Sequence, residues 1–200
     1  MKAVQKDKQI VYMAFLRGIN VGGHRSIKMN ELKEAFESIG FKNVETVLAS
    51  GNVFFNASKT NKRILVKRIE EKLKKTFGHE IGVLVRTVKE IQNLVNTNPF
   101  KSAKIIPQAK LFVTFLSEKP KLFKVIYESP KKDFKILRVS NSEVLSILSF
   151  PSIRAIDSMK ILEKNFGRKI TTRSWNTLIR ILKVKKEFAA KLLRASARTL

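Results

Sequence analysis

A glycine-rich segment at residues 17–26 is the first place where residue types and spacing suggest chemistry. It follows an apolar run, and the backbone N–H groups of such loops attract phosphate and other anions. Gly18 and Gly23 have the spacing of P-loop glycines, but His24 and Arg25 stand where that motif needs Lys and then Ser or Thr. A P-loop nucleotidase is therefore excluded. A general anion site and a purely structural loop both stay open. The candidate ligands of such a site are Arg17, Asn20, Gly22, Gly23, His24, Arg25 and Lys28.

A second segment, residues 171–177, reads Thr-Thr-Arg-Ser-Trp-Asn-Thr and holds the only tryptophan of the chain. Its arginine and tryptophan, with the N–H groups of a helix that starts there, could clamp a planar anion. The alternative is a helix capped by Ser174 or Thr172, with Trp175 in the core. The candidate ligands here are Thr172, Arg173, Trp175 and Asn176.

Most familiar catalytic constellations are missing from the sequence. The chain has no cysteine, which excludes disulfides, thiolate catalysis and cysteine-bound zinc. It has two histidines, His24 and His79, too few for a histidine metal site and a poor start for a Ser-His-Asp triad. We expect no metal and no cofactor.

The charge is strongly basic, with 41 Lys and Arg against 16 Asp and Glu. The second hundred residues carry 23 basic and 7 acidic residues, the first hundred 18 and 9. Such a field attracts polyanions, namely nucleic acid, nucleotides, acidic proteins or anionic membrane, although a lysine-rich surface can also serve solubility alone. Six of these cations surround the apolar stripe of the expected last helix: Arg180, Lys183, Lys185, Lys186, Lys191 and Arg194.

Aromatic residues on short apolar runs raise the alternative of an RNA-recognition motif, which stacks bases on strand aromatics. The run 110–116 is similar to the first-strand signature of that motif, and 50–55 faintly to its third. Phe54, Phe55, Phe112 and Phe115 would then be exposed; otherwise they belong to the core.

Hydrophobic periodicity predicts the elements that position these residues. In the first half we expect strands at 10–16, 44–49, 53–57 and 81–85, with Ser50, Gly51 and Asn52 as a hairpin turn. Helices are expected after Asn30 as N-cap, at 62–77 and at 88–95. The order β-α-β-β-α-β is the ferredoxin-like pattern.

The pattern then repeats after a polar stretch at 97–108. Strands are expected at 111–116, 134–139, 144–150 and 169–172, and helices at 120–127, 156–166 and 174–197. The sequence therefore predicts an α+β protein of two tandem ferredoxin-like βαββαβ halves, 1–97 and 109–200, the second ending in a long helix.

The compartment is expected to be the cytoplasm. Residues 1–9 are polar and lack the apolar run of a secretory signal, and no stretch approaches the length of a membrane-spanning helix.

Four short motifs together resemble one family. They are Phe-Leu-Arg-Gly-Ile-Asn-Val-Gly-Gly at 15–23, Ser-Gly-Asn-Val at 50–53, Asn-Pro-Phe at 98–100 and the Thr171–Thr177 segment. In this order they resemble the bacterial family catalogued as domain of unknown function 1697, with Ser174 where an asparagine is expected. The resemblance implies an α+β fold of ferredoxin-like pieces and a bacterial cytosolic protein. It implies no activity.

The motifs at 17–20, 50–52 and 171–176 are loop or element-end residues, which more often serve function than core residues do. We therefore hypothesise that they meet in one anion pocket and that the chain binds a phosphate-bearing ligand, nucleic acid or nucleotide. An enzyme that uses the same pocket and an interaction module without a ligand are the alternatives.

Overall fold

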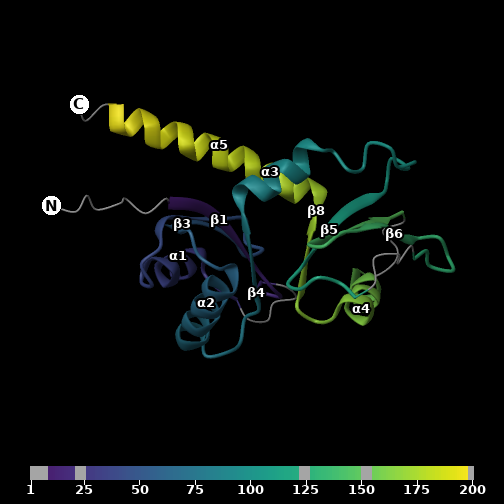
Figure 1. Ribbon diagram of the computed structural model, residues 1–200, viewed down its shortest axis with the longest axis horizontal. Coiled ribbons are helices and arrows are strands. Elements are labelled where there is room, and N and C mark those ends of the chain that lie inside the picture. Colours follow the sequence, from purple (N-terminus) through teal and green to yellow (C-terminus); the bar gives the residue numbers. More distant parts are fainter. Residues whose placement is uncertain (1–8, 21–25, 122–126, 150–154, 198–200) are drawn as a thin grey trace. The chain divides into compact units, whose positions relative to one another are not determined.

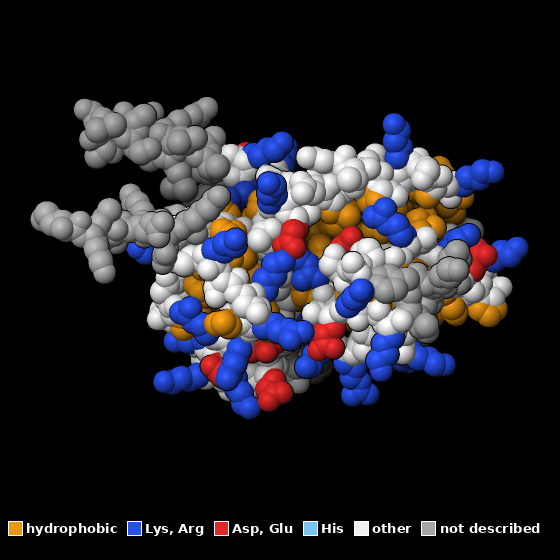
Figure 2. Space-filling view, viewed as in Figure 1, with side chains coloured by type: hydrophobic (Ala, Val, Ile, Leu, Met, Phe, Trp, Pro, Cys, Tyr) orange, Lys and Arg blue, Asp and Glu red, His pale blue; other side chains and the backbone are white. Residues whose placement is uncertain are grey.

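The computed structural model describes residues 9–20, 26–121, 127–149 and 155–197, with the backbone alone for 155–157 and 188–197. The described residues form eight strands and five helices in two compact units, Met1–Ile91 and Gln92–Leu200 (Figure 1). Each unit holds one four-stranded antiparallel sheet, so the protein is a mixed α+β protein. Lys and Arg side chains outnumber Asp and Glu on the face drawn in Figure 2.

The first unit follows the predicted order of strands and helices. Its sheet has the order β2-β3-β1-β4, with β1 paired to both β3 and β4. The elements are β1 (Gln9–Leu16), α1 (Met29–Glu37), β2 (Lys42–Val47), β3 (Asn52–Ser58), α2 (Lys62–Phe77), β4 (Val83–Thr87) and α3 (Val88–Asn96). The last of these, α3, runs across the division between the units.

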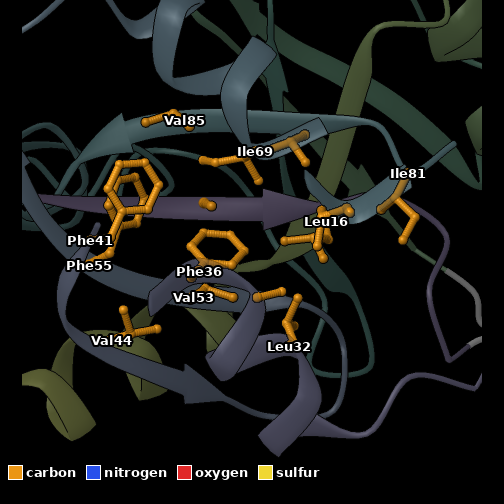
Figure 3. Close-up of a cluster of buried hydrophobic side chains, with 14 of the residues drawn as sticks. Leu16, Leu32, Phe36, Phe41, Val44, Val53, Phe55, Ile69, Ile81 and Val85 are labelled. Atoms are coloured by element: carbon orange, nitrogen blue, oxygen red, sulfur yellow. The ribbon is translucent and has the colours of Figure 1, made fainter. Parts of the chain in front are cut away.

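The core of the first unit lies between its sheet and helices α1 and α2 (Figure 3). Phe55 is its centre: its ring lies 4.4 Å from that of Phe41 and 5.6 Å from those of Tyr12 and Phe36. Leu65, Ile69 and Leu73 of α2 complete the packing at helical spacing. This burial is the main force that holds the sheet and its helices together.

The ends of the helices differ in part from expectation. Helix α1 begins at Met29 with Lys28 as N-cap, so the predicted cap at Asn30 is wrong. Lys28 is extended and offers no side-chain cap, and Asn30 lies inside the first turn. Helix α2 has the usual capping residues at both ends. The side chain of Asn61 accepts from the N–H of Arg63 at the start, and Gly78 ends the helix at φ 75°.

The second unit has a sheet of the same order, β6-β7-β5-β8. Its elements are β5 (Lys110–Leu116), β6 (Phe134–Val139), β7 (Glu143–Leu148), α4 (Ala155–Phe166), β8 (Ile170–Ser174) and α5 (Trp175–Ala197). The helix predicted at 120–127 falls mostly outside the described residues.

Helix α5 has 23 residues and packs against β5 and β8, and its residues Leu178, Ile181 and Leu182 are buried. Its outer side exposes Arg180, Lys183 and Lys186. Neither α5 nor another helix of the described part of the chain is long and apolar enough to cross a membrane.

Candidate functional site

The first two motifs meet at the end of the first sheet where β1 ends. The N–H of Leu16 donates to the carbonyl of Gly51 at 2.8 Å, and the N–H of Arg17 donates to the carbonyl of Gly82 at 2.9 Å. The loop that follows β1, the β2–β3 hairpin and the start of β4 therefore share one end of the sheet. Strand pairing brings them there, because β1 lies between β3 and β4.

Asn20 closes the base of the glycine-rich loop. Its side-chain Oδ1 accepts from the N–H of Ile27 at 2.7 Å, and its Nδ2 donates to the carbonyls of Ile27 at 3.1 Å and Ala49 at 2.8 Å. The residue has φ 54°, a conformation that asparagine tolerates better than most residues. The side-chain amide of Asn20 thus joins both ends of the loop to the hairpin. Asn20 is therefore a positioning residue.

The hairpin residues are shaped by close packing. Gly51 has φ 74°, and a Cβ there would lie 2.8 Å from Cδ1 of Ile19 and from Cβ of Leu16. Asn52 is fully buried, and its Nδ2 donates to the carbonyl of Val47 at 2.9 Å and to Oγ of Ser50 at 3.0 Å. Both residues hold the hairpin in position beside β1.

Two cations flank the described part of the glycine-rich loop, Arg17 at its start and Lys28 at its end. Arg17 is half-buried, and its Cβ and Cδ lie 3.8 and 3.9 Å from where a Cβ on Gly82 would be. Lys28 is exposed, and its Nζ lies 3.4 Å from Oε1 of Glu31. The predicted site residues Gly22, Gly23 and His24, and Arg25 with them, lie outside the described residues.

The third and fourth motifs contact each other in the second unit. The ring of Trp175 is buried and meets Phe100 edge-on at 5.2 Å between centroids. Ser174 caps α5, since its Oγ accepts from the N–H of Thr177 at 3.1 Å. Asn176 is exposed on the first turn. The predicted cap is confirmed, and Trp175 is a packing residue of this unit.

Arg173 is buried on β8. Its Nη1 donates to Oγ1 of Thr171 and to the carbonyl of Thr172, both at 2.9 Å. Burial lowers the pKa of Arg173 to about 10, so that it is still a cation at neutral pH. Thr172 points to the other face, where its Oγ1 lies 2.8 Å from that of Thr114. The joint pocket of Arg173 with Arg17 stays a prediction.

Sequence reasoning missed Arg86, which occupies in the first unit the position that Arg173 occupies in the second. Arg86 is also buried on the last strand of its sheet, and its Nη1 donates to the carbonyl of the preceding residue, Val85, at 3.0 Å. Each arginine precedes a hydroxyl residue, Thr87 or Ser174, that ends the strand directly before a helix. The shared pattern of arginine, hydroxyl and bulky apolar residue at 86–88 and 173–175 is the signal that could have revealed it.

The aromatic residues considered for base stacking are not on the surface. Phe54, Phe55 and Phe115 are buried, and Phe112 packs partly buried against the core of the second unit. They are core residues, so the alternative of an RNA-recognition motif is wrong for these strands. Among the residues the structure describes, no three His, Asp or Glu side chains lie together as a metal site requires.

Comparison with known proteins finds a family and a fold. The conserved bacterial protein SP0830 of Streptococcus pneumoniae has a similar structure, with a TM-score of 0.61 and 21% identity over 87% of this chain and 97% of its own. An unknown protein of Galdieria sulphuraria shares 11% identity over 84% of this chain and 98% of its own. Its TM-score of 0.26 is too low to indicate a common fold. No curated protein matches.

A family model matches residues 10–139, which include the first three motifs and leave out the Thr171–Thr177 segment. The match covers well over half of the sequence. The chain therefore belongs to the family described as protein of unknown function (DUF1697).

Proposed function

We propose that the chain binds a phosphate-bearing ligand, a nucleotide or a nucleic acid, at the end of the first sheet where β1 ends. The observation that carries this proposal is the direct hydrogen bonding between two motif segments, residues 16–20 and 49–52. Loops that are held together by a rigid scaffold are the usual place for a binding site.

The chemistry of the proposed site rests on side chains. The N–H groups of Leu16 and Arg17 are committed to the sheet, so they are not donors for a ligand. Arg17 has the guanidinium fork that suits phosphate oxygens, and Lys28 adds a second positive charge. The net charge of +25 raises the local concentration of any anion near the protein.

Preorganisation supports the same proposal. The three hydrogen bonds of Asn20 and the tight contact at Gly51 hold the loop base before any ligand arrives. A site that needs no ordering on binding loses less entropy. Ser50 and Asn52 belong to this scaffold, while Thr172, Arg173, Trp175 and Asn176 would join the site only in the shared pocket hypothesised from the sequence.

We further propose that the two halves, 1–97 and 109–200, are ferredoxin-like βαββαβ domains in tandem. The common strand orders, β2-β3-β1-β4 and β6-β7-β5-β8, support this proposal. So does the antiparallel pairing of the central strands β1 and β5 with both neighbours.

Fluorescence anisotropy tests the ligand class. Labelled single-stranded DNA, duplex DNA, RNA and a labelled adenine nucleotide are titrated with the protein at about 50 to 200 mM salt. Binding that survives the higher salt and prefers one probe supports the proposal. Weak binding to all four that vanishes with salt contradicts it, and leaves the charge as a generic field.

The variant Arg17→Ala tests the location. Loss of a charge-assisted hydrogen bond of about 1.5–3 kcal/mol predicts binding weaker by roughly 10- to 150-fold. Arg63→Ala is the matched control, because it removes the same charge from the exposed side of α2 in the same unit. Equal effects of the two variants would place the ligand elsewhere.

A further inference from the structure

The two units repeat the same hydrogen bonds where their central strands end. In the second unit the N–H of Leu116 donates to the carbonyl of Ser142 at 2.9 Å, and the N–H of Ser117 donates to that of Lys169 at 3.3 Å. These bonds correspond to Leu16–Gly51 and Arg17–Gly82 in the first unit. Positions at the two sheet ends can therefore be compared one by one.

At three positions the second unit has a cation where the first unit has an apolar residue or glycine. The residues before β4 are Ile81, which is buried, and Gly82; their counterparts before β8 are Arg168 and Lys169, both exposed. Ile19, buried two residues after Arg17, corresponds to exposed Lys119. Since the first unit forms the same sheet end with apolar residues and glycine, the fold does not require these charges.

Neighbouring segments add to the charge. Lys121 follows β5, and Lys164 lies in the last turn of α4, which ends just before Arg168. The first unit also has lysines in the equivalent turn, Lys74 and Lys75 of α2, so a lysine at this place is common to both units. The acidic residues of these segments are Glu118 and Glu163. We call this surface the β5–β8 basic end; it consists of the exposed residues Lys119, Lys121, Lys164, Arg168 and Lys169. Figure 1 shows β5 and β8 side by side, as their pairing requires.

We infer that the β5–β8 basic end binds the phosphate backbone of a nucleic acid strand. Its cations are exposed and come from three segments, an arrangement that follows a chain of phosphates better than it encloses one nucleotide. Four of the five are lysines, which act as point charges and read no base. The binding is therefore expected to be independent of base sequence and strongly dependent on salt.

This inference goes beyond the proposed function, because it concerns the other unit and one class of ligand. The test is the slope of log K against log salt concentration for the full chain with labelled single-stranded DNA and RNA. Each phosphate contact contributes about 0.7 to this slope for a single strand. The double variant Lys121→Gln/Lys169→Gln is expected to reduce the slope by about 1.4 and to weaken binding several-fold.

The control has the same net charge. Lys59→Gln/Lys89→Gln removes two exposed lysines from the opposite end of the first sheet, after β3 and in α3. A smaller slope for the first pair alone confirms the inference. Equal slopes for the two pairs, no binding by the unaltered chain, or binding only to vesicles that contain phosphatidylserine would each overturn it.

The same assay separates this inference from the proposed function. Arg17→Ala acts on the first unit, and an unchanged salt slope in that variant leaves the β5–β8 basic end in place even if the proposed site fails. Conversely, loss of nucleotide binding in Arg17→Ala with equal slopes for the two lysine pairs supports the proposed function alone.

Discussion

At Gly51 a hydrogen atom in place of a side chain lets the hairpin approach the end of β1. In the same region the side-chain amides of Asn20 and Asn52 donate hydrogen bonds to the backbone carbonyls of Ala49 and Val47. These residues belong to motifs that mark the family, yet their visible contacts are structural. The family motifs at this end thus specify a scaffold, and Arg17 and Lys28 are the described cations that it presents.

The variant Gly51→Ala tests that close approach. Left-handed backbone costs an alanine about 1 kcal/mol, and the clash with Leu16 and Ile19 adds about 1–3 kcal/mol. Gly40→Ala is the control, since Gly40 has φ 84° but a Cβ added there would meet no atom within 4 Å. Urea unfolding should show a clearly larger loss for Gly51→Ala. Equal losses would mean that the hairpin relaxes away from β1.

At the scale of elements, α3 and α5 begin in the same way. Thr87 and Glu90 form a reciprocal capping box, in which Oγ1 of Thr87 accepts from the N–H of Glu90 at 3.2 Å and Oε2 of Glu90 accepts from the N–H of Thr87 at 2.7 Å. Ser174 caps α5 through the N–H of Thr177. Each cap follows a buried arginine, Arg86 or Arg173. The strand–helix junctions β4–α3 and β8–α5 are therefore built in the same way.

Glu90 makes the stability of the β4–α3 junction depend on pH. Burial raises its pKa, but the hydrogen bonds from Lys62 and Thr87 outweigh burial and hold the carboxyl pKa below 4.5. A lowered folded-state pKa stabilises the fold above pH 4.5, and this contribution is lost as the pH falls through the folded value.

Glu90→Gln should therefore be less stable than the unaltered chain at pH 7, by up to about 1 kcal/mol for a half-exposed ion pair. The difference should shrink as the pH falls below about 4, as followed by urea unfolding at several pH values. Glu71→Gln breaks the exposed Lys67–Glu71 pair at 3.8 Å and should change stability little. A difference at Glu90 that stays constant with pH would contradict the assignment.

At the scale of the whole molecule, each unit has its own hydrophobic core. Leu73 is buried in the core of the first unit and Leu162 in that of the second. Trp175, the one tryptophan of the chain, belongs to the second unit. Its fluorescence therefore reports on one unit, while circular dichroism reports on both.

We predict separate unfolding transitions for the two units. Leu162→Ala should destabilise the second unit by about 2–5 kcal/mol and shift the fluorescence transition. Leu73→Ala should shift part of the circular dichroism transition and leave the fluorescence transition in place. If both variants move both signals together, the chain unfolds as one cooperative body.

Much of the fold could be predicted because its signals are local. The apolar run at 10–16, the turn at Ser50–Asn52 and the cap at Ser174 depend on residues close in sequence, and the structure contains a strand, a hairpin and a cap there. The helix start at Asn30 was misplaced because Met29 is stabilised by packing against the core rather than by a capping side chain.

The sequence by itself determined the α+β class, the strong positive charge and the family, since periodicity, composition and motifs are all readable along the chain. Tertiary structure alone decided which motifs meet, because Asn20 and Ala49 are 29 residues apart. It also decided that the equivalents of Ile81 and Gly82 are the exposed cations Arg168 and Lys169. That match depends on strand pairing between distant segments, and no local pattern contains it.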